Sequence, residues 1–150
     1  MDAINMMTML TTLTARQMFP SKELWVMFQP HTYSRLAALK SEFASALIHA
    51  NQVSITEIYA ARETNYSNIS GRDLAMSITG PPCEFFPCLD DVVDKLAQWV
   101  SLDPNRPLVI LTLGVGRNLF GRLVPRITHH TKPNSNHRIF FSFCLKKQVI

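Results

Sequence analysis

Four short apolar runs, each followed by a polar loop and then, in three cases, by an amphipathic segment, constrain the fold of this chain more than any other feature. The runs are ELWVMFQ at 23–29, QVSITEI at 52–58, CEFFPC at 83–88 and PLVILTLGVG at 107–116. Continuous apolar runs are typical of strands that are covered on both faces. Strands that alternate with helices form parallel sheets with right-handed crossovers. We therefore expect an α/β fold with a Rossmann-like, mostly parallel sheet and helices on both faces, in which the last run is central.

The segments around these runs have the periodicity of helices. Residues 35–49 place five apolar side chains on one helical face: Leu36, Leu39, Phe43, Ala46 and Leu47. Residues 90–100 begin with acids, which the helix dipole favours there, and repeat four apolar residues at helical spacing: Val93, Leu96, Ala97 and Val100. Residues 1–19 carry apolar residues three apart, which predict a helix that packs on the sheet: Ile4, Met7, Leu10 and Leu13.

A shorter helix is expected between the second and third runs. Ser70 and Asp73 have the spacing of a capping box, a reciprocal pair of hydrogen bonds that begins a helix. Gly80 and the two prolines after it are residues that end one.

Length and composition limit the class of protein. The 150 residues are enough for one domain with a core, and 47% of them are hydrophobic, which is a globular composition. No apolar stretch approaches the roughly 18–20 residues of a membrane helix, and Asp2 stands where a signal peptide needs positive charge. Three cysteines fit buried thiols in a reducing compartment better than a disulfide framework. We expect a cytoplasmic protein, or an organellar one if the source is eukaryotic, without a membrane partner.

Charge divides the chain at residue 117. Residues 1–116 hold eight Lys and Arg against eleven Asp and Glu, whereas residues 117–150 hold seven Lys and Arg and no acid. We therefore expect an α/β domain over 1–116 and a basic, poorly ordered tail over 117–150. A basic tail can bind nucleic acid or an anionic surface, but a solvated tail is the commoner case, so we expect no nucleic-acid partner.

The polar loops after the four runs would lie together. Ligands of parallel sheets bind outside the carboxyl ends of the strands. His31 and Arg35 lie one turn apart at the start of a helix, where free N–H groups and the dipole favour an anion; the alternative is a loop-capping His and a surface ion pair. Arg62 and Glu63 are a substrate clamp in one interpretation and an exposed salt bridge in the other.

Nucleotide-binding and zinc-binding motifs were considered, and the spacing or identity of the residues does not match them. The glycines of GVGRNLFGRL at 114–123 match neither the dinucleotide fingerprint nor the phosphate-binding loop, since Arg122 and Leu123 stand where Lys and Ser or Thr are required. Cysteines and tail histidines match no zinc pattern: Cys83, Cys88, His129, His130 and His137. We assign no metal site and no catalytic residue.

Several segments occur in the order and spacing of one known domain. They are LWVMFQPHTYSR at 24–35, EIYAARETN at 57–65, SGRDLA at 70–75, LDDVVDKLAQWV at 89–100 and LVILTLGVG at 108–116. Together they resemble the C-terminal domain of the UDP-N-acetylmuramate–L-alanine ligases, members of the Mur ligase family of peptidoglycan synthesis. The resemblance covers about 15–116, and FQPHTYSR is its most specific part.

The resemblance implies an activity and a set of site residues. Enzymes of this family have three domains, the last of which is Rossmann-like, closes over the others and helps to bind the amino acid. ATP and Mg²⁺ are the implied cofactors, bound mainly by the central domain, and UDP-N-acetylmuramate and L-alanine are the implied substrates. His31 and Arg35 would face the nucleotide and substrate phosphates, and five residues would border the amino-acid pocket: Tyr59, Ala60, Ala61, Arg62 and Glu63. Thr32 replaces a second base that many members carry there, so we expect one phosphate contact fewer.

The chain also departs from the family pattern. It has no phosphate-binding loop, so we expect a truncated ligase that is inactive alone and needs the missing domains in cis or in trans. No His precedes His31, where the family has a DDYAHHP-like segment, and Arg117 stands in place of an expected Asp. Residues 117–150 resemble nothing in the family. Two hypotheses follow: a domain of an ATP-dependent acid–amino-acid ligase, or a non-catalytic remnant or binding module with a Rossmann-like fold.

Overall fold

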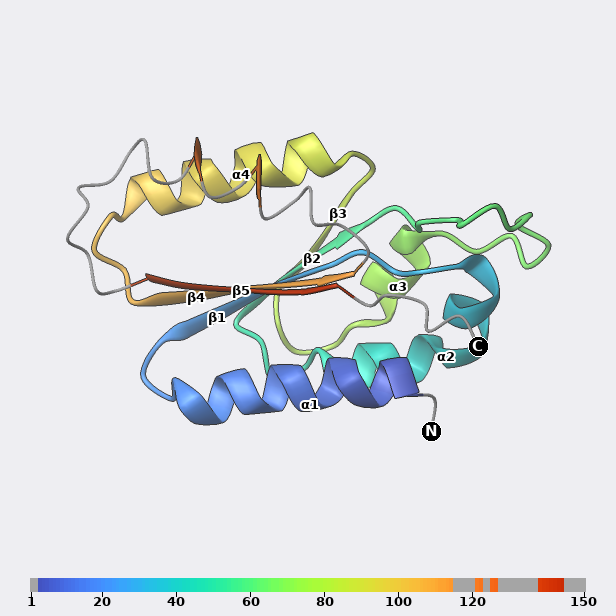
Figure 1. Cartoon of the computed structure of the whole chain (residues 1–150), viewed down its shortest axis with the longest axis horizontal. Helices are drawn as coiled ribbons and strands as arrows, with labels where there is room; N and C mark the ends of the chain where they lie inside the picture. Colours follow the sequence, from blue (N-terminus) through green and yellow to red (C-terminus); the bar gives the residue numbers. More distant parts are fainter. Residues whose placement is uncertain (1–2, 115–120, 123–124, 127–137, 145–150) are drawn as a thin grey trace.

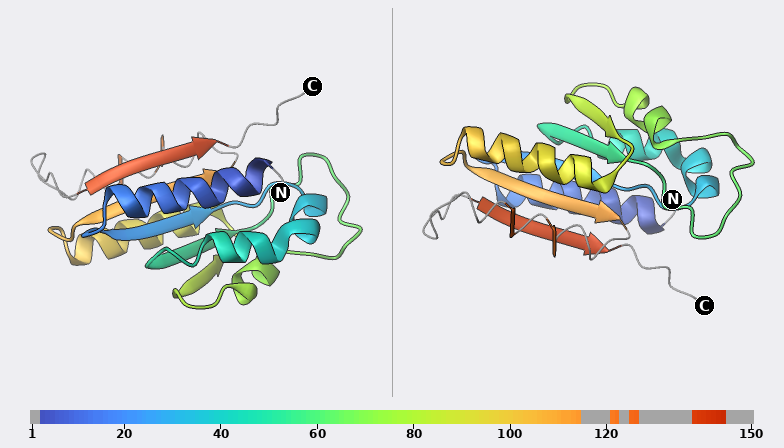
Figure 2. Two further views of the ribbon diagram at one scale, coloured as in Figure 1. Left: turned by 90° about the horizontal axis from the view of Figure 1, so that it is seen from below. Right: turned by 90° about the horizontal axis from the view of Figure 1, so that it is seen from above.

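The chain folds into one parallel sheet with helices on both faces (Figure 1). The computed structural model describes residues 3–114, 121–122, 125–126 and 138–144. The strands are β1 Glu23–Phe28, β2 Gln52–Thr56, β3 Cys83–Phe86, β4 Leu108–Gly114 and β5 Arg138–Cys144. The helices are α1 Ala3–Met18, α2 Tyr33–Ala46, α3 Gly71–Ser77 and α4 Leu89–Leu102. Every strand pair is parallel, in the order β3-β2-β1-β4-β5, with β3 and β5 at the two edges (Figure 2).

The central strand β1 feeds two cores because its side chains alternate between the faces of the sheet. Leu24, Val26 and Phe28 join a cluster with α1, α2 and α3 on one face. Trp25 and Met27 join a second cluster with α4 on the other. Figure 1 shows this division, with α1 and α2 below the sheet and α4 above it. The predicted α/β fold, with helices on both faces, is confirmed, and all seven residues of β4 are buried, as its apolar sequence predicts.

The predicted helix α1 is present and packs on the sheet through Ala15, but the predicted packed face is wrong. Met7 and Leu10, expected against the sheet, are 46% and 49% exposed. The buried face is formed by Thr8, Thr12 and Ala15 instead. Small residues let the helix approach its neighbours closely, and the Thr12 hydroxyl meets its hydrogen-bonding need internally by donating to the Thr8 carbonyl at 2.9 Å. Apolar residues spaced three positions apart therefore did not identify the packed face of α1.

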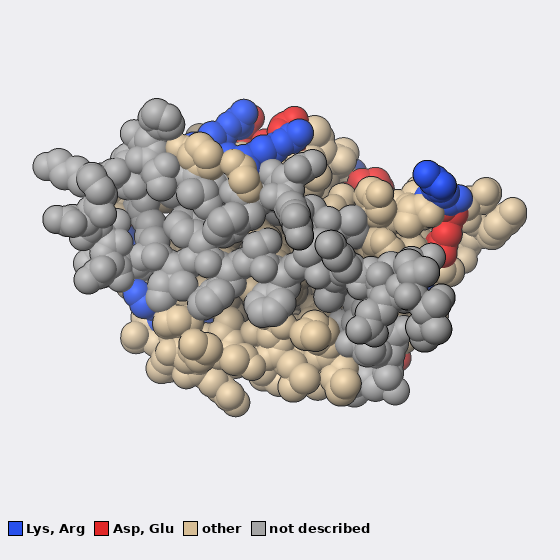
Figure 3. All heavy atoms as spheres, in the orientation of Figure 1, with Lys and Arg blue, Asp and Glu red and all other residues tan. Residues whose placement is uncertain are grey.

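The fifth strand was not predicted. Residues 138–144 pair with all of β4, from Leu108 opposite Arg138 to Gly114 opposite Cys144, so part of the segment expected as a tail belongs to the sheet. The expectation of a poorly ordered tail otherwise concerns residues outside the described part, apart from two short pieces. In these pieces Arg122 pairs with Asp90 at 2.7 Å and Arg126 pairs with Asp94. Figure 3 accordingly shows basic and acidic side chains next to one another over α4.

The strand order places a topological switch point between β1 and β4. The chain leaves β1 through α2 on one face and reaches β4 through α4 on the other, so the carboxyl ends of β1 and β4 flank a topological switch point, where ligands of such sheets bind. The Gln29 N–H donates to the Leu113 carbonyl at 2.9 Å across this point. Gly114 has φ +137°, and a Cβ there would lie 2.8 Å from the Gln29 carbonyl oxygen. Within the described residues, no helix is long and apolar enough to cross a membrane.

Gly71 provides a test of the packing between α3 and β2. A Cβ at this position would lie 2.1 Å from the Thr56 carbonyl oxygen and 3.0 Å from the Phe85 ring, so backbone atoms would have to move. We expect Gly71→Ala to lower the free energy of unfolding by about 1–3 kcal/mol, as overpacking does in other cores. Urea denaturation measures this change. Gly121→Ala, where nothing lies within 4 Å of the added Cβ, is the matched control; equal effects of both substitutions would contradict the described packing.

Candidate functional site at the carboxyl edge

Backbone pairing between β1 and β2 resumes after both strands have ended. The Thr32 N–H donates to the Tyr59 carbonyl, and the Tyr59 N–H donates to the Pro30 carbonyl, both at 2.9 Å. These bonds form an isolated parallel bridge between His31 and Tyr59. The two rings stack with their centroids 5.6 Å apart and their planes 18° apart. His31 is 8% exposed and Tyr59 is 46% exposed, so Tyr59 forms the outer layer of this pair.

Arg35 lies one helical turn after His31 and contacts its ring. The Arg35 Nη1 and the His31 Nδ1 are 3.2 Å apart. A guanidinium is always protonated and can only donate, so Nδ1 is the acceptor in this contact. The neutral ring then carries its proton on Nε2. The contact therefore fixes both the tautomer of His31 and the direction of the Arg35 side chain.

A carboxylate of the chain itself occupies the first turn of α2. Glu63 accepts hydrogen bonds from the Ser34 N–H at 3.0 Å and from the Ser34 hydroxyl at 2.6 Å. The Ser34 hydroxyl, then its backbone N–H, lower the pKa of Glu63 from its ordinary value of 4.5. Thr32, the N-cap residue with φ 64°, accepts from the Arg35 N–H at 3.4 Å. The N–H groups expected to hold an external anion are thus partly satisfied from within.

These groups surround a cavity of about 340 Å³. Its walls come from the start of α2 and from the loop after β2: His31, Thr32, Ser34, Arg35, Ala38, Leu39 and Glu63. Positive charge from Arg35 and negative charge from Glu63 therefore face the same space. An arrangement of this kind suits a ligand, or a pair of ligands, that carries both signs of charge.

The structure brings the predicted site residues together on one edge. His31, Arg35 and Glu63 line the cavity, and Tyr59 joins it by stacking on His31. Ala60 accepts from the Glu63 N–H at 2.9 Å in a tight turn, in which Ala61 and Arg62 have φ 51° and 70°. Arg62 is exposed and does not line the cavity. The roles of all these site residues toward a substrate stay predictions.

The sequence did not indicate the contribution of Ser34 or the N-cap role of Thr32. A Thr immediately before a helical segment is an N-cap signal, so this role of Thr32 could have been predicted. Ser34 carries no such signal, because its role depends on Glu63, which is 29 residues away.

No group of three His, Cys, Asp or Glu side chains that could hold a metal ion occurs in the part of the chain the structure describes. Among the residues that line the cavity, Arg35 is a cation that could pair with a phosphate. The three histidines considered as ligands, at positions 129, 130 and 137, lie outside the described residues.

Known proteins similar to this chain are UDP-N-acetylmuramate–L-alanine ligases. That of Lachnospira eligens is 45% identical over 108 residues, which are 70% of this chain and 22% of that protein. Those of Frankia casuarinae and Desulfitobacterium hafniense are 36% identical over 111 residues and 40% identical over 105, covering 71% and 68% of this chain. The chain is a homologue of part of these ligases. It spans 22% of each of these three relatives, and no family model matches it.

The contribution of the Glu63 carboxylate at the start of α2 to the stability of this chain can be tested. The folded-state pKa of Glu63 is depressed, so its stabilisation is present above the unfolded value near 4.5 and is lost as the pH falls through the folded value. We expect Glu63→Gln to lower the free energy of unfolding at pH 7 by about 0.3–1 kcal/mol, because a charge leaves a helix N-terminus. Urea titrations across the acidic range measure this difference.

The pH dependence distinguishes the charge from other effects of the substitution. The difference between wild type and Glu63→Gln should shrink as the pH falls below 4.5. Glu42→Gln, at an exposed position further along α2, is the control and should change the free energy of unfolding little. A Glu63→Gln effect of constant size across this range would contradict the assigned role.

Proposed function

We propose that this chain acts as the closing, amino-acid-binding domain of an ATP-dependent UDP-N-acetylmuramate–L-alanine ligase. One observation carries the proposal: the motif residues His31, Arg35 and Tyr59 gather at the carboxyl ends of the neighbouring strands β1 and β2. The homology to these ligases supports the same assignment. The other domains would come from the same polypeptide or from a partner.

The reaction joins a carboxylate to an amine. When bound, ATP with Mg²⁺ would supply the phosphoryl group that activates the muramyl carboxylate, and ADP would leave. The alanine amine would then attack the activated carbonyl carbon, the C–O bond to phosphate would break, and inorganic phosphate and the amine proton would leave as the amide forms. Arg35 would stabilise phosphate charge, which is where positioned cations contribute most to such reactions. His31 would orient Arg35 through Nδ1, and the residues from Tyr59 to Glu63 would border the amino acid.

A second candidate function is a binding module without catalysis. The observation that favours it is the carboxylate of Glu63 at the start of α2, because an incoming phosphate would have to compete with it. In this case the cavity would bind an amino acid or nucleotide without turnover.

A chimera distinguishes these functions. The matching segment of the Lachnospira eligens ligase would be replaced by residues 3–114 of this chain, and phosphate release dependent on UDP-N-acetylmuramate and L-alanine would be measured. We expect activity in the chimera, and Arg35→Ala should lower its kcat/KM by about 10- to 100-fold through lost charge stabilisation. Arg35→Lys, which keeps the charge, should lose less.

Controls separate folding from function. Arg72→Ala changes an exposed arginine on α3, stacked over Phe85, and should leave activity unchanged. The 150-residue chain alone should release no phosphate. A folded chimera without activity, or one in which Arg35→Ala has no effect, would reject the ligase assignment and leave the binding module.

A further inference from the structure

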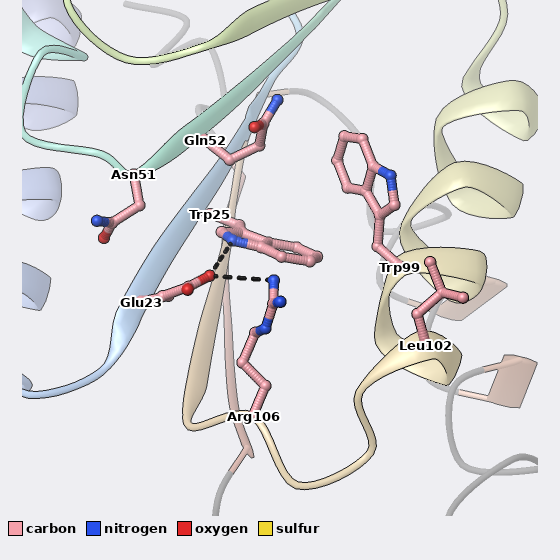
Figure 4. Close-up of a pocket in the computed structure, with 7 residues that line it drawn as sticks. All are labelled: Glu23, Trp25, Asn51, Gln52, Trp99, Leu102 and Arg106. Carbon is pink, nitrogen blue, oxygen red and sulfur yellow. Dashed lines mark hydrogen bonds and ion pairs between the residues drawn. The ribbon is translucent and has the colours of Figure 1, made fainter.

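Both tryptophans of the chain line a second cavity, at the opposite edge of the sheet. Glu23 begins β1, Gln52 begins β2 and Arg106 precedes β4, so these residues lie at the amino ends of the strands. The volume is about 410 Å³, within the roughly 300–1,000 Å³ of small-molecule sites. Its walls are Glu23, Trp25, Asn51, Gln52, Trp99, Leu102 and Arg106, which we call the amino-edge cavity (Figure 4).

Two indole rings give this cavity flat apolar walls. Trp25 and Trp99 meet edge to face, with centroids 5.3 Å apart and planes at 78°. Trp25 is only 5% exposed and forms the floor, whereas Trp99, on α4, is half-buried and leaves part of its ring accessible. In Figure 4 the Trp99 ring stands to one side of the space above Trp25. A half-open indole of this kind is a stacking surface for a planar ring.

One face of each indole already has a cation from the chain itself. The Arg106 guanidinium lies 5.8 Å from the Trp25 centroid and pairs with the Glu23 Oε2 at 3.5 Å. The Trp25 indole N–H also donates to Glu23 Oε2, at 3.0 Å. The Lys95 ammonium lies 5.4 Å from the Trp99 centroid. An aromatic cage without such cations would bind a cationic ligand. The two indoles of this cavity already have a cation each, so the cavity favours a neutral planar ligand.

Gln52 supplies the specificity of the cavity. Its side-chain amide is half-buried and makes no hydrogen bond to any residue that the structure describes. Figure 4 shows this amide on the other side of the space from Trp99. A primary amide presents a donor and an acceptor in one plane, which matches the adenine edge in a bidentate pair. Two other polar side chains of the wall are already engaged. Glu23 contacts Trp25 and Arg106, and the Asn51 side-chain oxygen accepts from the Leu24 N–H at 2.8 Å and from Arg16.

We propose that the amino-edge cavity binds a purine base, stacked on Trp99 and paired through its hydrogen-bonding edge with Gln52. The free amide of Gln52 makes adenine the preferred base. A guanine would have to compete with Arg106 and Trp25 for the carboxylate of Glu23. This site shares no residue with the cavity that His31, Arg35 and Glu63 line, so a test of it does not depend on the ligase assignment.

Tryptophan fluorescence of the full 150-residue chain tests the proposal directly, because the only two indoles of the chain line this cavity. Adenosine, guanosine and cytidine would be titrated separately, with excitation at the red edge of indole absorption. We expect saturable quenching by adenosine, weaker binding of guanosine and no saturation by cytidine. Absence of saturation by adenosine at millimolar concentrations, or equal affinity for cytidine, would overturn the proposal.

Variants connect the signal to Gln52. Gln52→Leu should weaken adenosine binding about tenfold, because a bidentate base contact is lost. Gln52→Glu is the second variant, for use if Gln52→Leu fails to fold. It keeps the size of the side chain, removes the amide donor and should weaken adenosine binding by a similar factor. Gln98→Leu, at an exposed position beside Trp99 that does not line the cavity, is the matched control and should leave the affinity unchanged. Unchanged affinity in folded Gln52→Glu would overturn the assigned contact.

Discussion

The pairing of His31 with Tyr59 holds the carboxyl edge of this molecule together. Loops after neighbouring parallel strands usually diverge, but here two backbone hydrogen bonds at 2.9 Å continue the pairing between β1 and β2 past their ends. The bridge fixes the His31 ring against Tyr59, and the ring in turn directs Arg35 from the first turn of α2. The placement of His31, and through it of Arg35, therefore depends on one short stretch of strand pairing.

The same loop explains the charge balance of the cavity. The tight turn at Ala61 and Arg62 returns the chain so that Glu63 reaches the start of α2, where Ser34 binds its carboxylate. Arg35 and Glu63 then face one space with opposite charges. Arg35 is a partner for a phosphate and Glu63 for an ammonium group, although Glu63 already accepts two hydrogen bonds from Ser34. The amino edge differs in kind, with aromatic walls and an amide in place of opposed charges.

The fold was predictable from sequence because its strands are buried on both faces and their apolar runs are bounded by turn residues. β4 is the clearest case, with all seven residues buried. The packed face of α1 was not predictable from spacing, since Thr8 and Thr12 are buried by close helix packing while Met7 and Leu10 are exposed. β5 was missed because the basic charge of the last 34 residues suggested a tail, while its pairing with β4 is a long-range interaction.

The candidate site was predicted in its position more than in its contacts. Parallel topology and the FQPHTYSR motif indicated that His31, Arg35 and Tyr59 share an edge. The bond between Ser34 and Glu63 and the strained turn before it are properties of the folded loop, and no local pattern encodes them. The two tryptophans, 74 positions apart, likewise meet only through the packing of α4 on β1.

The most direct test of the shared edge is the nuclear Overhauser effect between the rings of His31 and Tyr59 in the folded chain. Stacked rings with centroids 5.6 Å apart predict cross-peaks between their carbon-bound protons, which should disappear in Tyr59→Ala. Cross-peaks that are absent in a folded wild-type chain would show that the exits of β1 and β2 do not meet. That result would contradict the carboxyl-edge site and the function proposed for it.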